Sequence, residues 1–182
     1  MQVLSRQRGI SLIEVMMAVL IFSIGLIGLA SLMVMATRSN HAAYVRTQAV
    51  FLANSMAARM SANPIGVWNG NYNSTAYPVS SSSIGCGSGA ACDAAELATH
   101  DQRLWSSQLK TFLPNPTATI NCTGVGSAGY DPTPQLAMRP PYGGTCAMTI
   151  TWNEQGAGDN KGTGNDASKA NADRTFTWDF QP

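Results

Sequence analysis

The sequence is poor in charged residues and in histidine, on which many catalytic and nucleic-acid-binding sites depend. Charged residues make up 12% of its 182 positions, the net charge is +1, and two histidines are present. Bulk charge therefore does not indicate a nucleic-acid partner. The sequence contains neither a Gly-x-x-x-x-Gly-Lys phosphate-binding loop nor a Gly-x-Ser-x-Gly nucleophile elbow. We therefore predict a protein that is not an enzyme and that needs no cofactor.

The missing charges are concentrated in one stretch near the N-terminus. Residues 15–37 contain no charged side chain, and Arg6 and Arg8 precede them. As a helix, this stretch would span about 35 Å, and a bilayer core is about 30 Å thick. A soluble core helix rarely stays apolar on every face for that length. The sequence therefore predicts one membrane-spanning helix.

Glu14 separates three interpretations of this segment. A secretory signal with a cleavage site near residues 34–36 would have a shorter apolar region. A plain membrane anchor accounts for the length and the basic flank but not for an acid inside the apolar run. An intramembrane carboxylate costs about 2.5–3.5 kcal/mol, so it indicates either a functional site or a position close enough to the interface to reach water.

The residues around Glu14 resemble the processing site of type IV prepilins and pseudopilins. The string is Arg8-Gly9-Ile10-Ser11-Leu12-Ile13-Glu14-Val15. The resemblance implies that prepilin peptidase cuts between Gly9 and Ile10, removing residues 1–9 as a basic leader, and that Ile10 is then N-methylated. Ile10 departs from the family pattern, in which phenylalanine or methionine is commoner. Glycine before the cut leaves the backbone unhindered.

Cleavage would give Glu14 the partner that it lacks. It creates an ammonium at Ile10, four residues before Glu14. In a filament of low dielectric constant, this ammonium would attract the carboxylate of a neighbouring subunit, whereas either charge alone would be costly. Glu14 is therefore the expected assembly residue.

We expect the helix to continue beyond the membrane. Apolar residues recur at spacings of three and four between polar ones, which indicates an amphipathic helix; they are Val45, Ala49, Leu52, Met56 and Met60. Asn63-Pro64 should end it. The predicted organisation is a transmembrane and assembly helix at 10–37, a stalk helix at 38–62 and a globular head at 63–182.

The head is predicted to contain a second helix after a loop at residues 66–92. Asp93 can cap a helix over 94–113, because Glu96 lies three residues on, and Pro114 closes it. One face of this helix should be apolar; its members are Leu97, Leu104, Trp105, Leu109 and Phe112.

The rest of the head is predicted to be an antiparallel sheet. Residues 117–121 form a short candidate strand, while residues 146–152 and 175–180 alternate apolar and polar side chains. The last two strands should pair through the polar loop 153–173, with Ile150 and Trp178 facing the stalk helix. The predicted fold class is α+β: a long helix packed on a sheet, as in pilins.

All four cysteines follow the membrane segment, where an oxidising compartment is expected. They are Cys86, Cys92, Cys122 and Cys146. Three pairings are possible. We favour Cys86–Cys92, which closes a short loop, and Cys122–Cys146, which would join neighbouring strands. Zinc is the alternative, but the spacings are not finger-like and the histidines are His41 and His100, so we expect no metal.

The head and the run of residues 23–30 also resemble minor pilins of the PilV type, the type IV pilus modification proteins. That resemblance implies a subunit that helps to initiate or assemble pili and so supports adhesion, twitching motility or DNA uptake. The expected partners are major and minor pilins, prepilin peptidase, the inner-membrane assembly machinery and membrane lipid. The expected location is the inner membrane with the head in the periplasm, and then the pilus surface.

Two other functions share parts of this pattern. A minor pseudopilin of a type II secretion system has the same processing site. A DNA-binding receptor pilin is the other alternative, but cleavage after Gly9 would leave nine basic and ten acidic residues with no evident basic cluster. Nucleic acid is therefore not an expected partner.

Overall fold

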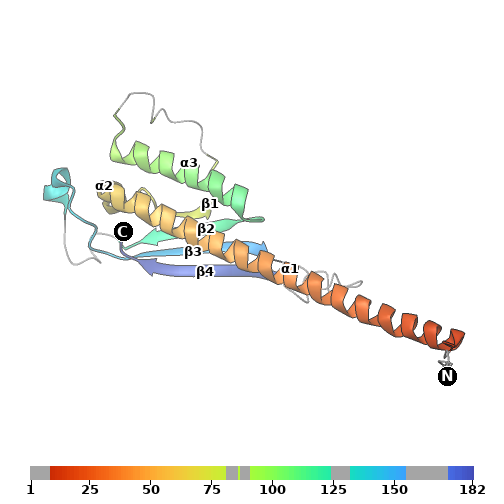
Figure 1. Ribbon diagram of the computed structural model, residues 1–182. Helices are drawn as coiled ribbons and strands as arrows, with labels where there is room; N and C mark the ends of the chain where they lie inside the picture. The colour runs from red at the N-terminus through yellow and green to blue at the C-terminus, as the bar shows by residue number, and fades with distance from the viewer. Residues whose placement is uncertain (1–8, 81–85, 87–90, 124–131, 155–171) are drawn as a thin grey trace, which may run out of the picture.

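The computed structural model describes residues 9–80, 86, 91–123, 132–154 and 172–182. Its main feature is one long helix that projects beyond a head of shorter helices and a sheet (Figure 1). The elements in chain order are α1 (Leu12–Ala62), α2 (Pro64–Trp68), β1 (Ser74–Tyr77), α3 (Ala94–Phe112), β2 (Thr117–Cys122), η2 (Thr133–Met138), β3 (Cys146–Glu154) and β4 (Ala172–Phe180). The predicted α+β layout, a long helix on an antiparallel sheet, is confirmed.

Helix α1 runs without a break for 51 residues, which corresponds to about 75 Å. Ser11 is its N-cap and Asn63 its C-cap, so it ends where the Asn63-Pro64 pair predicted. Its second half packs on the head, and the buried positions follow the helical period: Ala42, Val45, Ala49, Leu52, Ala53, Met56 and Met60. The predicted amphipathic stripe is therefore the face that joins α1 to the head.

The four strands form an antiparallel sheet in the order β1-β2-β3-β4. On β3 every second residue is buried, from Cys146 to Glu154. In register, Ala118 lies opposite Ile150, and Ile150 lies opposite Phe176. Ile150 is fully buried and Trp178 packs at the margin of the core, as expected. The loop predicted between β3 and β4 falls mostly at 155–171, outside the described residues.

Trp105 on α3 stands at the centre of the core. Its side chain is fully buried, and its indole N–H donates to the carbonyl oxygen of Leu52 at 2.9 Å. Its ring meets that of Tyr77 edge to face, with centroids 5.1 Å apart. One residue thereby connects α3 to α1 and to β1, because a buried indole needs both an apolar surface and an acceptor.

Asn63 connects three elements at the end of α1. Its side chain donates to the hydroxyl of Tyr72 at 3.1 Å and to the carbonyl of Ala94 at 2.8 Å, and accepts from the amide of Gly66 at 3.2 Å. A Cβ at Gly66 would lie 2.9 Å from Asn63 Cγ. Glycine is therefore required at 66 so that α2 can approach this cap closely.

The prediction of a plain loop over residues 66–92 was wrong. The segment contains the end of α2 and all of β1. Pro64 occupies the first turn of α2, where its missing N–H costs nothing, and Tyr77 is buried against Trp105. The many Gly, Ser and Asn residues of this segment predict a loop. Its short elements form because contacts with the core stabilise them more than local propensity does.

The position of α3 was predicted correctly, but its buried face was predicted only in part. Asp93 caps the helix and forms the capping box with Glu96, as expected. Leu97 and Leu104 are only half-buried, and Phe112 is exposed. Ala98, Asp101 and Ser106 are buried with Trp105 and Leu109 instead. Asp101 pairs with Arg59 and Tyr72, and Ser106 accepts from the backbone N–H of Val79. These polar partners turn a different face of α3 toward the core than hydrophobicity alone predicts.

Candidate processing and assembly site

The predicted cleavage site lies just outside the start of α1. Gly9 and Ile10 are exposed and adopt no regular secondary structure, and helical structure starts at Leu12 after the N-cap Ser11. A Cβ at Gly9 would meet nothing within 4 Å. The chain's own packing therefore does not require glycine here, and a bond outside a helix is one that a protease can bind in extended form. Arg6 and Arg8 lie outside the described residues.

Glu14 lies in the first turn of α1 and is exposed. Its backbone N–H donates to the carbonyl of Ser11 at 3.0 Å. A carboxylate in the first turn interacts favourably with the positive end of the helix dipole. Within the described residues no side chain of the protomer pairs with the Glu14 carboxylate. The carboxylate is thus available to a partner outside this chain.

The first half of α1 is exposed along its whole length, and no described residue of the head covers it. From Leu12 to Arg38 every residue is exposed, including large apolar side chains such as Ile21, Phe22 and Ile27. It is long and apolar enough to cross a membrane. Exposed apolar surface on this scale needs lipid or another protein around it.

A buried ion pair fixes the second half of α1 to α3. The Arg59 guanidinium lies 2.9 Å from Asp101 Oδ1, and the Tyr72 hydroxyl donates to Asp101 Oδ2 at 2.8 Å. The Asp101 side chain is 8% exposed. Burial raises the pKa of the Tyr72 phenol above its usual range, and the Asp101 carboxylate adds to this. Sequence analysis missed the group; the signal was an acid among the apolar positions of α3.

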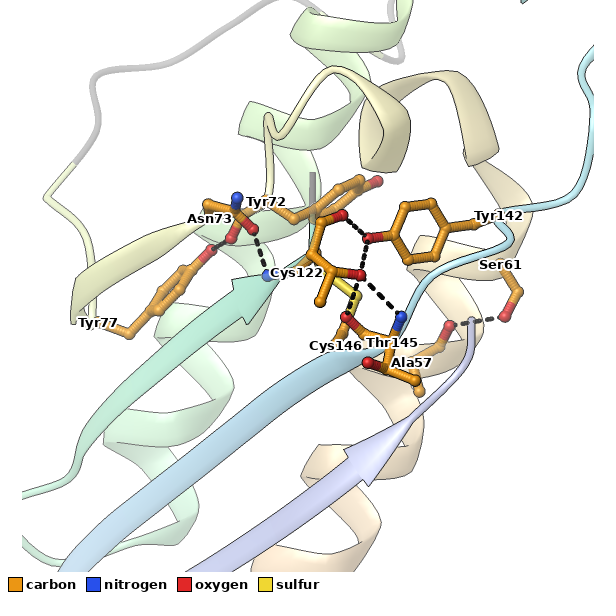
Figure 2. The surroundings of a disulfide bond; sticks show 10 residues. Ala57, Ser61, Tyr72, Asn73, Tyr77, Cys122, Tyr142, Thr145 and Cys146 are labelled. Carbon is orange, nitrogen blue, oxygen red and sulfur yellow. Dashed lines mark hydrogen bonds between the residues drawn. A yellow bond between two sulfur atoms is a disulfide. The ribbon is translucent and has the colours of Figure 1, made fainter. Parts of the chain in front are cut away.

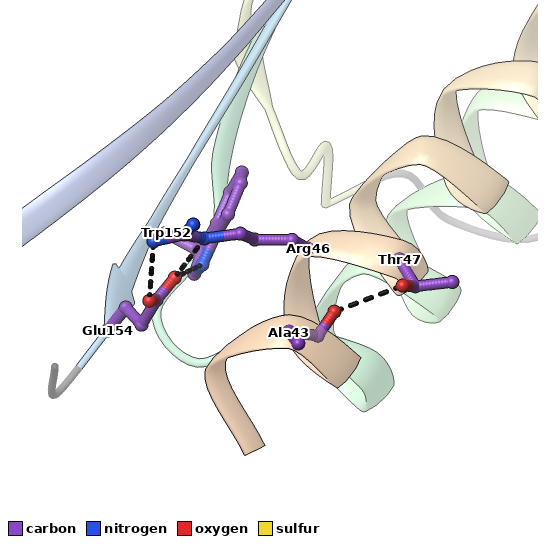
Figure 3. A network of polar contacts seen from close by, with 5 residues as sticks. All are labelled: Ala43, Arg46, Thr47, Trp152 and Glu154. Atoms are coloured by element: carbon purple, nitrogen blue, oxygen red, sulfur yellow. Dashed lines mark hydrogen bonds and ion pairs between the residues drawn. The ribbon is translucent and has the colours of Figure 1, made fainter. Parts of the chain in front are cut away.

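A second ion pair joins α1 to the end of β3. The Arg46 guanidinium makes two bonds to the Glu154 carboxylate, at 3.0 and 3.3 Å, and the Trp152 indole N–H donates to it at 3.3 Å (Figure 3). Glu154 is the fifth member of the alternating buried set of β3. Extending that alternation past Trp152 would have placed an acid on the inner face, which requires a cation opposite it.

The structure joins the cysteines in the favoured pairs, Cys86–Cys92 and Cys122–Cys146. The second disulfide connects directly opposed residues of β2 and β3. Around it, Thr123 and Tyr142 are hydrogen-bonded, and Thr145 N–H donates to the Thr123 hydroxyl oxygen at 3.0 Å. Cys122 N–H donates to Asn73 Oδ1 at 2.9 Å (Figure 2). The disulfide therefore joins the two strands at the ends of the segment that contains η2.

Metal-ligating side chains do not gather in the part of the chain that the structure describes: no three of its His, Cys, Asp and Glu residues lie close enough to hold an ion. His41 lies on the stalk and His100 on α3, in different elements.

Comparison with known proteins gives one family match. Residues 4–30 match the model of the prokaryotic N-terminal methylation motif. Neither curated proteins nor solved structures give a significant match to the chain. The motif covers the expected cleavage site, Glu14 and most of the exposed half of α1. It supports a type IV pilin-like prepilin, a kind of protein with a structural function. Among the described residues, α1 is the one helix long and apolar enough to anchor such a protein in a membrane.

Proposed function

We propose that the protein is a minor type IV pilin of the PilV type, which prepilin peptidase processes and which takes part in the initiation and assembly of pili. One observation carries the proposal: the N-terminal methylation motif leads into a helix whose first half is exposed and whose second half is fixed to a folded head. The described part of the head has a hydrophobic core of its own, whereas the apolar half of α1 is exposed and needs a partner.

The mechanism follows from the start of α1. Cleavage between Gly9 and Ile10 leaves an ammonium at Ile10, which methylation keeps cationic. Before assembly the protomer is held in the inner membrane by the first half of α1, with its head in the periplasm. On assembly the ammonium pairs with Glu14 of a neighbouring subunit, and the pair fixes the relative position of the two helices. The apolar half-helices then bury one another in place of lipid.

Mass spectrometry of the N-terminal peptide tests the processing step. The protein purified from its native membrane should start at Ile10 and carry one added methyl group. Gly9→Val should leave the leader attached, because the side chain obstructs the peptidase, while the head keeps its melting temperature. Ser11→Ala is the matched control, since Ser11 makes no side-chain cap hydrogen bond. An unmodified N-terminus at Met1 in the native protein would refute the proposal.

A minor pseudopilin of a type II secretion system is the second candidate, because the same motif serves both assemblies. Deleting the gene separates them. If the protein is a pilin, the deletion mutant should lose surface pili and twitching motility but still secrete its enzymes into the medium. Loss of secretion with normal pilus number would assign the protein to the secretion system instead.

A further inference from the structure

A cavity of about 280 Å³ lies between the stalk part of α1 and the start of β4. Two arginines line it, together with apolar and aromatic residues and one threonine: Arg46, Val50, Trp152, Arg174, Thr175 and Phe176. The cavity adjoins the Arg46–Glu154 pair that Figure 3 shows. Neither the cleavage after Gly9 nor the pairing of Glu14 uses it.

The two arginines differ in how their charge is balanced. The Glu154 carboxylate, whose side chain is 3% exposed, neutralises Arg46. Arg174 has no anion and no hydrogen-bond acceptor within the described residues, and its Nε is buried. Its neighbour Asp173 is hydrogen-bonded to Asn153 instead. A partly buried guanidinium without an acceptor is costly, so the cavity favours a ligand with one negative charge.

The charged and apolar parts of the cavity follow one another in a fixed order along the molecule. On α1, Val50 lies four residues beyond Arg46, about 6 Å farther from the membrane segment. Strand β4 runs in the same direction as α1 (Figure 1), so Phe176 lies beyond Arg174 by two residues of strand, about 7 Å. Both walls therefore require a ligand with its acid toward the membrane and its apolar group about 6–7 Å farther away.

A helix parallel to α1 has this order when an acid is followed four positions later by an apolar residue, because four residues of helix also span about 6 Å. Subunits whose N-terminal halves are inserted in one membrane have parallel helices. The order excludes a phospholipid of that membrane, since its acyl chain would lie on the membrane side of the phosphate. A free inorganic anion would leave Val50 and Phe176 without a partner.

The stalk of a second copy of this chain does not supply such an acid. Glu14 is the one acidic residue of α1, and the assembly mechanism assigns it to the ammonium at Ile10. The stalk itself has three arginines and no acid; the arginines are Arg38, Arg46 and Arg59. A second copy that placed its stalk along the cavity would therefore bring no anion to it.

We propose that the cavity accepts an Asp or Glu side chain from the stalk helix of a different pilin-like subunit. Arg174 donates to the carboxylate, and an apolar residue four positions later packs against Val50 and Phe176. The neighbour of this protein on the β4 side is then a different subunit, chosen by complementary charge. The inference rests on the proposed function, because it needs subunits that assemble side by side.

Site-specific photocrosslinking in sheared filaments tests this assignment. Thr175 and Thr177 are both exposed on the outer face of β4, but only Thr175 lines the cavity. With benzoylphenylalanine at position 175, we expect a crosslink to a helix of a different subunit, within one turn of an acid. Arg174→Gln should reduce this product about tenfold per molecule in the filament, as loss of one charged hydrogen bond predicts. The product from position 177 should be unchanged by Arg174→Gln.

A charge swap tests the contact itself. Arg174→Glu should lower the amount of this protein in filaments by about tenfold or more, whereas Lys110→Glu, the same change of charge at an exposed site on α3, should leave it unchanged. Replacing the crosslinked acid of the partner by arginine should restore the incorporation of Arg174→Glu. A misfolded head could not be restored in this way.

Four results would overturn the proposal. They are normal incorporation of Arg174→Glu, failure of the partner's arginine to restore it, a crosslink far from any acid, and a crosslink to a second copy or to residues 155–171 of the same chain. The N-terminal peptide of the same filaments reports processing. An uncleaved N-terminus would contradict the proposed function, whereas normal cleavage and filament content with any of the four results would contradict only this inference.

Discussion

The two halves of α1 are both rich in apolar residues, yet only one is packed in the protomer. From Leu12 to Arg38 every residue is exposed, whereas in the stalk half a buried residue recurs every three or four positions. The first half is apolar on all sides, so it has no single face to turn toward a head. The comparison shows that periodicity, and not hydrophobicity, decides which half the head packs against.

The sharpest way to break this comparison is to remove the charge from the membrane half. In Glu14→Ala filaments the ammonium at Ile10 would stay unpaired, which costs about 3–5 kcal/mol. We expect filament content to fall by on the order of 100-fold or more, while cleavage, membrane insertion and head stability stay normal. Immunoblots of membrane and sheared-filament fractions measure this.

Ser23→Ala is the matched control for Glu14→Ala. Ser23 lies on the same exposed half, and its hydroxyl bonds only to the carbonyl of Val19 in its own helix. Its filament content should match the wild type. Equal filament content in Glu14→Ala would mean that Glu14 serves only as an interfacial residue.

Removing the acid that pairs with the stalk half should lower the stability of the head, whereas Glu14→Ala should lower filament content and leave stability unchanged. Asp101→Ala leaves Arg59 without its anion and Tyr72 without its acceptor, in a site where the acid is 8% exposed. We expect the free energy of unfolding to fall by about 3–5 kcal/mol, measured by denaturant titration of the protein in detergent. Asp179→Ala, on the exposed side of β4, is the control and should change it by less than about 0.5 kcal/mol.

Two adjacent stalk residues sharpen the comparison within one turn of helix. Leu52 is fully buried and Phe51 is 60% exposed. Leu52→Ala should destabilise the head by about 2–5 kcal/mol because it leaves a cavity, whereas Phe51→Ala should cost less than about 0.5 kcal/mol. Thermal unfolding followed by circular dichroism distinguishes them. Similar losses for both would mean that the outer face of the stalk also packs within the protomer.

The smallest expected effect is a dependence on pH that only the head should show. Burial raises the pKa of Tyr72 and of Tyr77 above the ordinary value of 10.0. Both phenols therefore stay protonated in the folded state where they ionise in the unfolded chain. Their contribution is fully present below pH 10 and is lost as pH rises above it, by about 1.4 kcal/mol per tyrosine at pH 11.

Denaturant titrations at pH 9 and pH 11 measure this loss. Tyr72→Phe should reduce the difference between the two pH values by about half, because one of the two buried phenols is then absent. A wild-type stability that does not change between pH 9 and pH 11 would contradict the prediction.

Local sequence signals predicted the elements whose ends are determined by a few adjacent residues. Asp93 and Glu96 specify the start of α3 because their side chains satisfy the first backbone N–H groups. Asn63-Pro64 ends α1 because proline cannot continue it. The alternation on β3 and β4 predicted both strands and their pairing, since a strand with one buried face repeats every two residues.

Elements without such signals could not be predicted, because contacts distant in sequence form them. Strand β1 has only four residues, and Tyr77 stabilises it by packing on Trp105. The face of α3 depends on Asp101, whose partners Arg59 and Tyr72 belong to other segments. A burial rule that sorts side chains by hydrophobicity places such an acid outside, since it does not include the cation that compensates it.

The sequence by itself determined the long apolar helix, its continuation as a stalk, and the order of helix and strands in the head, because hydrophobic periodicity and capping are local properties. It also supplied the candidate cleavage and assembly residues Gly9, Ile10 and Glu14. The tertiary structure alone decided how the head closes: the Asn63 contacts, the two ion pairs on α1, and the cavity beside Arg174. These depend on side chains that folding brings together, and no local pattern encodes that proximity.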